Sequence, residues 1–158
     1  MATKKQHRIV FAVDGSRSAE AALATALKFP WPASSNACAV VARSSSWLPA
    51  ASEYARSVIE NGFQAAAAAA RSALSKRWPE SKVVIADARP VDAILAEAER
   101  FEASLIVLGW RGHGVFRRLL AGSVSRSVAE RAQCPVLVVR EAACSPPLRG
   151  RVRWLPQC

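Results

Sequence analysis

The sequence predicts an α/β fold in which one open, five-stranded parallel sheet is covered by helices on both faces. Five short apolar runs, rich in valine and isoleucine, alternate with four segments whose apolar residues recur at helical spacing. The apolar runs are continuous, which is typical of strands buried on both faces of a parallel sheet. The 158 residues are enough for one domain with one core.

The first half of the chain contains two predicted strands, each followed by a helix. In order, we expect a strand at 8–13, a helix at 19–27, a strand at 37–42 and a helix at about 51–77. Ser16 or Ser18 can cap the first helix. Six consecutive alanines, 65–70, favour the second helix. Its inward stripe is expected to contain Tyr54, Val58, Phe63, Ala67, Ala70 and Leu74.

The second half continues the alternation and ends on a strand. We expect a strand at 82–86, a helix from Pro90 to about Ala98, a strand at 104–108, a helix at 124–132 and a strand at 135–140. Neighbouring strands 1 and 4 would bring Asp14 and Gly109 to one crevice, because parallel sheets bind ligands at the carboxyl ends of their strands.

Glycines follow the fourth predicted strand in a pattern that is typical of phosphate binding. Gly109 and Gly112 are followed, nine residues later, by Gly122-Ser123 and then by a predicted helix. Glycine allows the backbone to approach an anion closely, and the first amides of a helix point outward with partial positive charge. The pattern lacks the lysine of a Walker A loop and the third glycine of a dinucleotide fingerprint. It therefore predicts a different type of nucleotide or phosphate site.

Charge and composition limit the possible functions. The net charge is +10, and residues 109–140 hold six arginines against one glutamate. Such an excess of positive charge would attract an anionic ligand. The alternative is a basic surface that has no specific role. No apolar run approaches the ~20 residues of a membrane span, and no signal core is visible. The four cysteines form no CxxC pair, so we expect no metal site and Cys38 is expected to be a buried thiol. A cytoplasmic protein without a membrane partner is expected.

The strand ending in Asp14-Gly15-Ser16, the glycine pattern and the final segment Cys134-Pro135-Val136-Leu137 together resemble the universal stress protein family, in its ATP-binding form. The resemblance covers about residues 8–140. It implies the adenine nucleotide alpha hydrolase-like fold with strand order 3-2-1-4-5. We expect a universal stress protein domain at 1–141 and a basic proline- and arginine-containing tail at 142–158.

The resemblance also implies a ligand and its contacts. Asp14 would contact the adenosine of ATP, the backbone of Val41 would contact adenine, and Gly109 and Gly112 would line the ribose and phosphates. Gly122 and Ser123 would hold the phosphates, with Mg²⁺ accompanying the nucleotide. Members commonly pair as homodimers through the last strand, whose unpaired edge invites another strand.

Structural explanations remain open for the same residues. Asp14 can form an Asx turn or cap a helix, Ser123 can be only an N-cap, and the glycines can be turn residues. Val41 can be a core residue, and Trp110 can stack on a base, cover a dimer surface or cover its local surroundings.

The first functional hypothesis is a non-catalytic, ATP-binding regulator of the stress response. One alternative is slow ATP hydrolysis involving Asp14 and His113, and we expect at most weak hydrolysis. The other is a module that binds anions or nucleic acid through Arg149, Arg151, Arg153 and Trp154 of the tail, although nucleic acid is not the expected partner.

Overall fold

The computed structural model describes residues 6–43, 52–110 and 123–140. Strands and helices alternate along these residues. They are β1 (Arg8–Ala12), α1 (Arg17–Leu27), β2 (Asn36–Ala42), α2 (Glu53–Ser75), β3 (Lys82–Ala86), α3 (Pro90–Arg100), β4 (Leu105–Gly109), α4 (Ser123–Arg131) and β5 (Val136–Val139). Each predicted element is present, and the predicted strand at 82–86 has the same bounds as β3.

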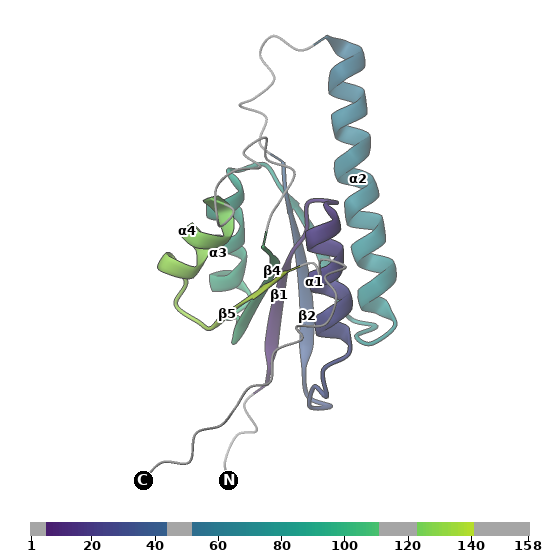
Figure 1. The fold of residues 1–158 in the computed structure, drawn as a ribbon. Helices are drawn as coiled ribbons and strands as arrows, with labels where there is room; N and C mark the ends of the chain where they lie inside the picture. The colour runs from purple at the N-terminus through teal and green to yellow at the C-terminus, as the bar shows by residue number, and fades with distance from the viewer. Residues whose placement is uncertain (1–5, 44–51, 111–122, 141–158) are drawn as a thin grey trace, which may run out of the picture.

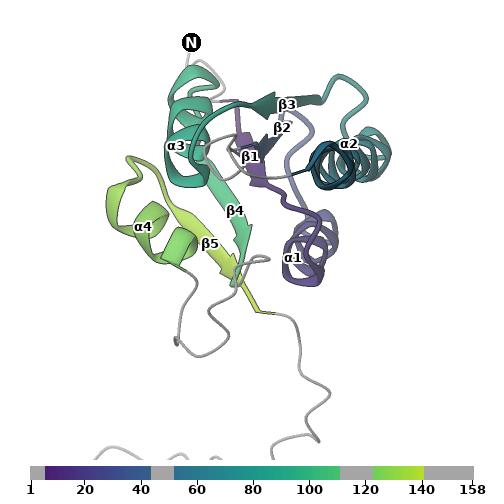
Figure 2. The same ribbon diagram turned by 90° about the horizontal axis from the view of Figure 1, so that it is seen from above.

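The strands form one parallel sheet in the order β3-β2-β1-β4-β5, which confirms the predicted fold and strand order. β1 is central: Phe11 is in register with Ala39 of β2 on one side and with Val107 of β4 on the other. Figures 1 and 2 show α1 and α2 on one face of the sheet and α3 and α4 on the other. The carboxyl ends of the strands therefore meet at one edge, where each following helix begins.

Two hydrophobic layers hold the helices to the sheet. Ile9 and Phe11 point toward α1 and α2, whereas Val10 between them points toward α3 and α4. This alternation explains why β1 is apolar at successive positions, since both of its faces are covered. Burying a side chain such as Phe11, 1% exposed, contributes on the order of 2 kcal/mol.

A buried thiol and a buried carboxyl group meet in the layer below α3. Cys38 of β2 is fully buried, as predicted, and its Sγ donates to Oε1 of Glu97 at 3.1 Å. Glu97 is 6% exposed, and Arg100 Nε donates to its Oε2 at 2.9 Å. Burial and then the Glu97 hydrogen bond raise the pKa of the Cys38 thiol to about 12.

The inward stripe predicted for α2 is only partly correct. Ala67, Ala70 and Leu74 are buried, but Tyr54 and Val58 are 79% and 51% exposed. Nine residues, or two and a half helical turns, separate Tyr54 from the half-buried Phe63, so their side chains point in opposite directions. The first turns of α2 also extend past the sheet in Figure 1, so neither side of them is fully covered.

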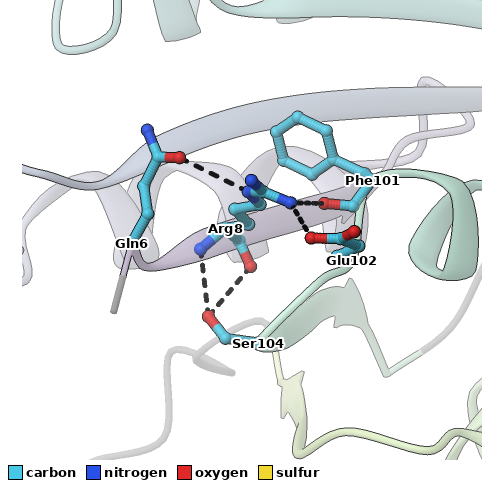
Figure 3. Close-up of polar contacts among 5 residues, drawn as sticks. All are labelled: Gln6, Arg8, Phe101, Glu102 and Ser104. Atoms are coloured by element: carbon cyan, nitrogen blue, oxygen red, sulfur yellow. Dashed lines mark hydrogen bonds and ion pairs between the residues drawn. The ribbon is translucent and has the colours of Figure 1, made fainter. Parts of the chain in front are cut away.

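A polar cluster around Arg8 joins the start of β1 to the turn before β4 (Figure 3). The Arg8 amide donates to Ser104 Oγ at 3.0 Å, and the Ser104 amide donates to the Arg8 carbonyl at 2.7 Å. The Arg8 guanidinium donates to the Phe101 carbonyl at 3.4 Å and pairs with Glu102. These contacts fix β1 and β4 to each other at their amino-terminal ends.

Candidate functional site

The parallel pairing of β1 with β4 brings Asp14 and Gly109 to the same edge of the sheet. Val13 and then Asp14 follow the last residue of β1, and Gly109 is the last residue of β4. The α1 helix begins directly after the Asp14 turn, and α4 begins at Ser123. Two helix N-termini therefore contribute partial positive charge at this edge, which suits an anionic ligand.

The Asp14 turn is built by local hydrogen bonds. Asp14 Oδ1 accepts from the Ser16 amide at 3.0 Å, and Gly15 adopts a φ of 76°, which favours glycine. Ser16 is the N-cap of α1, since its Oγ accepts from the Ala19 amide at 3.2 Å. Asp14 thus has the structural role of an Asx turn, and this turn holds its half-buried carboxyl group at the carboxyl end of β1.

Gly109 is required by packing between β4 and α1. A Cβ at this position would lie 2.6 Å from the carbonyl carbon of Ser18 and 2.8 Å from the amide nitrogen of Ala19. No ordinary side chain fits such a contact with backbone atoms. The absence of a side chain at Gly109 therefore lets the first turn of α1 reach the end of β4, which places that helix terminus beside the candidate site.

The start of α4 is attached to the end of β4 by Ser125. Ser125 is 4% exposed, and its Oγ donates to the Trp110 carbonyl at 3.3 Å. The Trp110 amide donates to the Val139 carbonyl at 2.7 Å, and the Arg140 guanidinium lies 4.9 Å from the centre of the Trp110 ring. These contacts fix both flanks of residues 111–122, and they support the local role of Trp110.

Ser123 and Ser125 have different environments. Ser123 is the first residue of α4 and is exposed, so it is placed to meet a ligand. Ser125 was missed by sequence reasoning, because no motif distinguishes it from the neighbouring serines of this helix. Gly112 and Gly122 lie outside the described residues, as do His113, the arginines of 111–118 and the tail 142–158.

On β2, the direction of the backbone groups favours Ala42 over Val41 as a contact in the crevice. The Val13 amide donates to the Val40 carbonyl at 3.0 Å, so the peptide groups of Val40 face β1. The Arg43 amide donates to the Ala86 carbonyl at 2.7 Å, so the peptide groups of Arg43 face β3. Backbone groups of successive residues in a strand point to opposite sides. Val41 therefore faces β3, with its side chain fully buried, and Ala42 faces the side of β1, beyond the last residue of that strand.

Charged side chains surround the carboxyl ends of β2 and β3. Arg43 donates to Glu60 of α2 at 3.2 Å and lies 3.7 Å from Asp87. The hydrogen bond from Gln64, followed by those from Arg43, lowers the pKa of Glu60. Beside them lies an open groove of about 460 Å³, whose lining includes Arg43, Arg56, Phe63 and Asp87.

Within 6–43, 52–110 and 123–140, no group of three or more histidine, cysteine, aspartate or glutamate side chains is placed to hold a metal ion. In the same part of the chain, no helix is long and apolar enough to cross a membrane.

Comparison with known proteins matches this arrangement to one family. The model of the universal stress protein family matches residues 6–140. Universal stress protein Rv2623 of Mycobacterium tuberculosis is 31% identical over 151 residues, which cover 87% of this chain and 46% of that protein. The chain spans about half the length of the curated relatives it matches.

Two solved structures share the fold over nearly their whole length. The universal stress protein UspA from Lactobacillus plantarum has a TM-score of 0.65 and 27% identity, with 87% of this chain and 100% of that chain covered. A universal stress protein solved in complex with cAMP has a TM-score of 0.62 and 25% identity, with 84% of this chain and 96% of that chain covered.

Proposed function

Because the chain belongs to the universal stress protein family, we propose that it binds ATP or another adenine nucleotide at the edge where Asp14, Gly109 and Ser123 lie. The observation that supports this most is the link between β4 and α4. Ser125 holds the first turn of α4 to the Trp110 carbonyl at 3.3 Å, directly after Gly109. The glycine-containing segment thus begins and ends at one place, beside the exposed Ser123.

The chemistry of this edge fits a nucleoside phosphate. The N-terminus of α4 presents outward amides and the Ser123 hydroxyl to phosphate oxygens. Gly112 and Gly122 are proposed to complete that cradle. The Asp14 carboxylate suits the hydroxyl groups of a ribose, since an ionised carboxylate accepts hydrogen bonds. That a related universal stress protein was solved with cAMP supports an adenine nucleotide as the ligand.

The base is proposed to lie against the end of β2. Adenine presents a donor and an acceptor side by side, and a backbone N–H and C=O can pair with them. The family resemblance implies a contact from the backbone of Val41. The orientation of the strand makes Ala42 the better candidate, because its peptide groups face the crevice while Val41 faces β3.

We propose that Mg²⁺ accompanies the nucleotide through the phosphate oxygens. The described residues offer Asp14 as a nearby carboxylate but no ready-made metal cluster. The proposed role is regulatory rather than catalytic: nucleotide binding would shift the population of dimer states. The dimer is proposed to form through β5, which lies at one edge of the sheet and is paired to β4 on its other side.

Ligand release and titration test the proposal. Protein purified and then denatured should release an adenine nucleotide that mass spectrometry identifies. Calorimetry with ATP and Mg²⁺ should show saturable binding, and Gly122→Val should abolish it without unfolding the protein, because the added side chain would fill the proposed phosphate cradle. Gly62→Ala is the matched control, since Gly62 on α2 has nothing within 4 Å of an added Cβ.

Other outcomes of the same experiments would contradict the proposal. A folded wild-type protein that shows no binding at millimolar ATP refutes the proposal. Steady phosphate release that disappears in Asp14→Ala and Gly122→Val would refute the non-catalytic role. Phosphate release that persists in both variants would indicate a contaminating enzyme.

A further inference from the structure

We propose that the outward face of α2 is a self-complementary interface, on which a second copy of this chain packs its own α2 in the antiparallel direction. The surface consists of Tyr54, Val58, Asn61, Ala65, Ala68, Ala69 and Ser72, and all of them are exposed. They recur at three- and four-residue spacing along one side of the helix, opposite the buried Ala67, Ala70 and Leu74.

This face is unusually apolar for one that points to solvent. Tyr54 and Val58 are 79% and 51% exposed and account for two of the four large exposed hydrophobic side chains among the described residues. The outward-facing alanines Ala65, Ala68 and Ala69 continue the apolar surface for about one more turn. Aromatic side chains in such positions are enriched at protein interfaces.

Large and small residues occupy opposite halves of the surface. An antiparallel pair whose two-fold axis passes between Asn61 and Gly62 places Tyr54 opposite the partner's Ala69. The same axis places Val58 opposite the partner's Ala65. Each large side chain therefore meets a small one, and the pattern repeats on the other side of the axis. Gly62 carries no side chain at the axis, and within one copy nothing lies within 4 Å of an added Cβ. Alanine and glycine at a helix crossing permit a close approach.

The charges at the edge of the surface fit the same axis. Glu53 and Arg71 are exposed on the same flank of α2, and both lie next to the apolar surface. In the antiparallel pair, Glu53 of one copy lies beside the partner's Arg71, and the reverse contact forms at the other end. In a parallel pair with its two-fold axis along the helices, this flank of the two copies would lie on opposite sides of the pair, so Glu53 would not meet the partner's Arg71. The charges therefore favour the antiparallel arrangement.

The surface is separate from the proposed β5 edge. α2 packs on the side of the sheet formed by β2 and β3, whereas β5 lies at the opposite edge (Figure 2). Pairing through α2 would therefore leave both β5 and the nucleotide edge of each copy accessible. It would join two chains, or two β5 dimers, into a larger symmetric assembly.

Disulfide trapping in the full-length chain tests the arrangement. Asn61→Cys lies next to the proposed axis and should form an intermolecular disulfide under mild oxidation, well above the wild-type level from the native cysteines. Ser72→Cys is the matched control on the same helix face, because the two copies of this residue would be about 31 Å apart along an antiparallel pair. Mass spectrometry should identify the cross-linked α2 peptide. Cross-linking at Ser72→Cys but not at Asn61→Cys would overturn the antiparallel arrangement.

Equilibrium sedimentation supplies an independent test. Ala65→Glu should weaken the association through α2 by at least about tenfold, because the partner's Val58 would desolvate a charge. Ala96→Glu, on an exposed position of α3, should leave association unchanged. Glu53→Arg and Arg71→Glu should each weaken association, and their combination should restore it. If Ala65→Glu and the single charge reversals leave the association state unchanged, the proposal is wrong, whatever the state of the β5 edge.

Discussion

The backbone of Ser18 in α1 occupies the space that a side chain on Gly109 of β4 would need. The distance from an ideal Cβ at Gly109 to the Ser18 carbonyl oxygen would be 2.7 Å. This glycine therefore has a packing role that is independent of any ligand. The same contact brings the start of α1 to the end of β4, so packing and the geometry of the candidate site depend on one residue.

Gly109→Ala is expected to destabilise the fold. The new methyl group would force backbone atoms of α1 away from β4, and overpacking of this kind typically costs about 1–3 kcal/mol. Urea unfolding measures the effect. Gly62→Ala should stabilise the protein by up to about 1 kcal/mol, since it replaces a glycine in an open helical position. A Gly109→Ala protein as stable as the wild type would contradict the close packing described for α1.

Ser125→Ala is expected to weaken both stability and nucleotide binding. The change leaves the Trp110 carbonyl without its 3.3 Å partner, at a cost of about 1 kcal/mol. It also releases α4 from β4. The Kd for ATP should therefore rise even in the fraction of the protein that remains folded. Ser127→Ala on the same helix is the control and should have little effect on the Kd. Calorimetric titration of the folded variants separates the two effects, and an unchanged Kd in Ser125→Ala would contradict the positioning role.

Two substitutions separate the turn role of Asp14 from its proposed ligand role. Asn at this position can still accept the hydrogen bond from the Ser16 amide, whereas Ala cannot. We expect Asp14→Asn to keep most of the stability and Asp14→Ala to lose about 1 kcal/mol. Both should bind ATP less tightly if the carboxylate contacts the ribose. Wild-type affinity in Asp14→Asn would show that the carboxylate charge is not needed.

The stability of the protein is expected to fall in alkaline solution because of Cys38. The thiol has a pKa of about 12 in the folded protein, compared with an ordinary value of 9.0. Between these values the unfolded chain releases a proton that the folded chain keeps. The stabilisation is thus complete below pH 9.0 and is lost as the pH rises toward the folded value, by at most about 1.4 kcal/mol per pH unit.

The Cys38→Ala variant provides the comparison for this pH dependence. It should be less stable at pH 8, because it leaves a small cavity and removes the hydrogen bond to Glu97, but its stability should fall less steeply above pH 9. Chemical unfolding at a series of pH values measures both curves. Equal slopes above pH 9 would show that another group governs the alkaline loss of stability. Cys38 should also resist thiol reagents in the folded protein, since it is fully buried.

The order of the elements was predictable because it depends on short-range patterns. Continuous apolar runs such as residues 83–86 of β3 differ from the helical spacing of alanine and leucine in α1, and these differences do not depend on distant contacts. Pro90 predicted the start of α3 correctly for the same reason. The stripe predicted for α2 was wrong for a local reason, because the spacing of Tyr54 and Val58 places them on the side of the helix opposite the buried Ala70 and Leu74. The tertiary structure adds which of these two sides the sheet covers.

The candidate site was predictable to the level of its segments but not of its contacts. Asp14 and Gly109 were expected at one edge, and the parallel pairing of β1 with β4 places them there. The role of Ser125, and the preference for Ala42 over Val41, depend on side-chain direction and on the pairing of each peptide group. Such details follow from the register between strands, which local patterns do not specify.

The sequence by itself determined the alternation of strands and helices and the places where glycine and polar residues interrupt it, because hydrophobic periodicity and backbone preferences act between near neighbours. Only the tertiary structure showed that α1 packs too closely on Gly109 for a side chain, that Ser125 is the serine that links α4 to the end of β4, and which face of α2 is exposed. Each of these depends on atoms that are far apart in the chain and become neighbours only when the sheet forms and the helices pack on it.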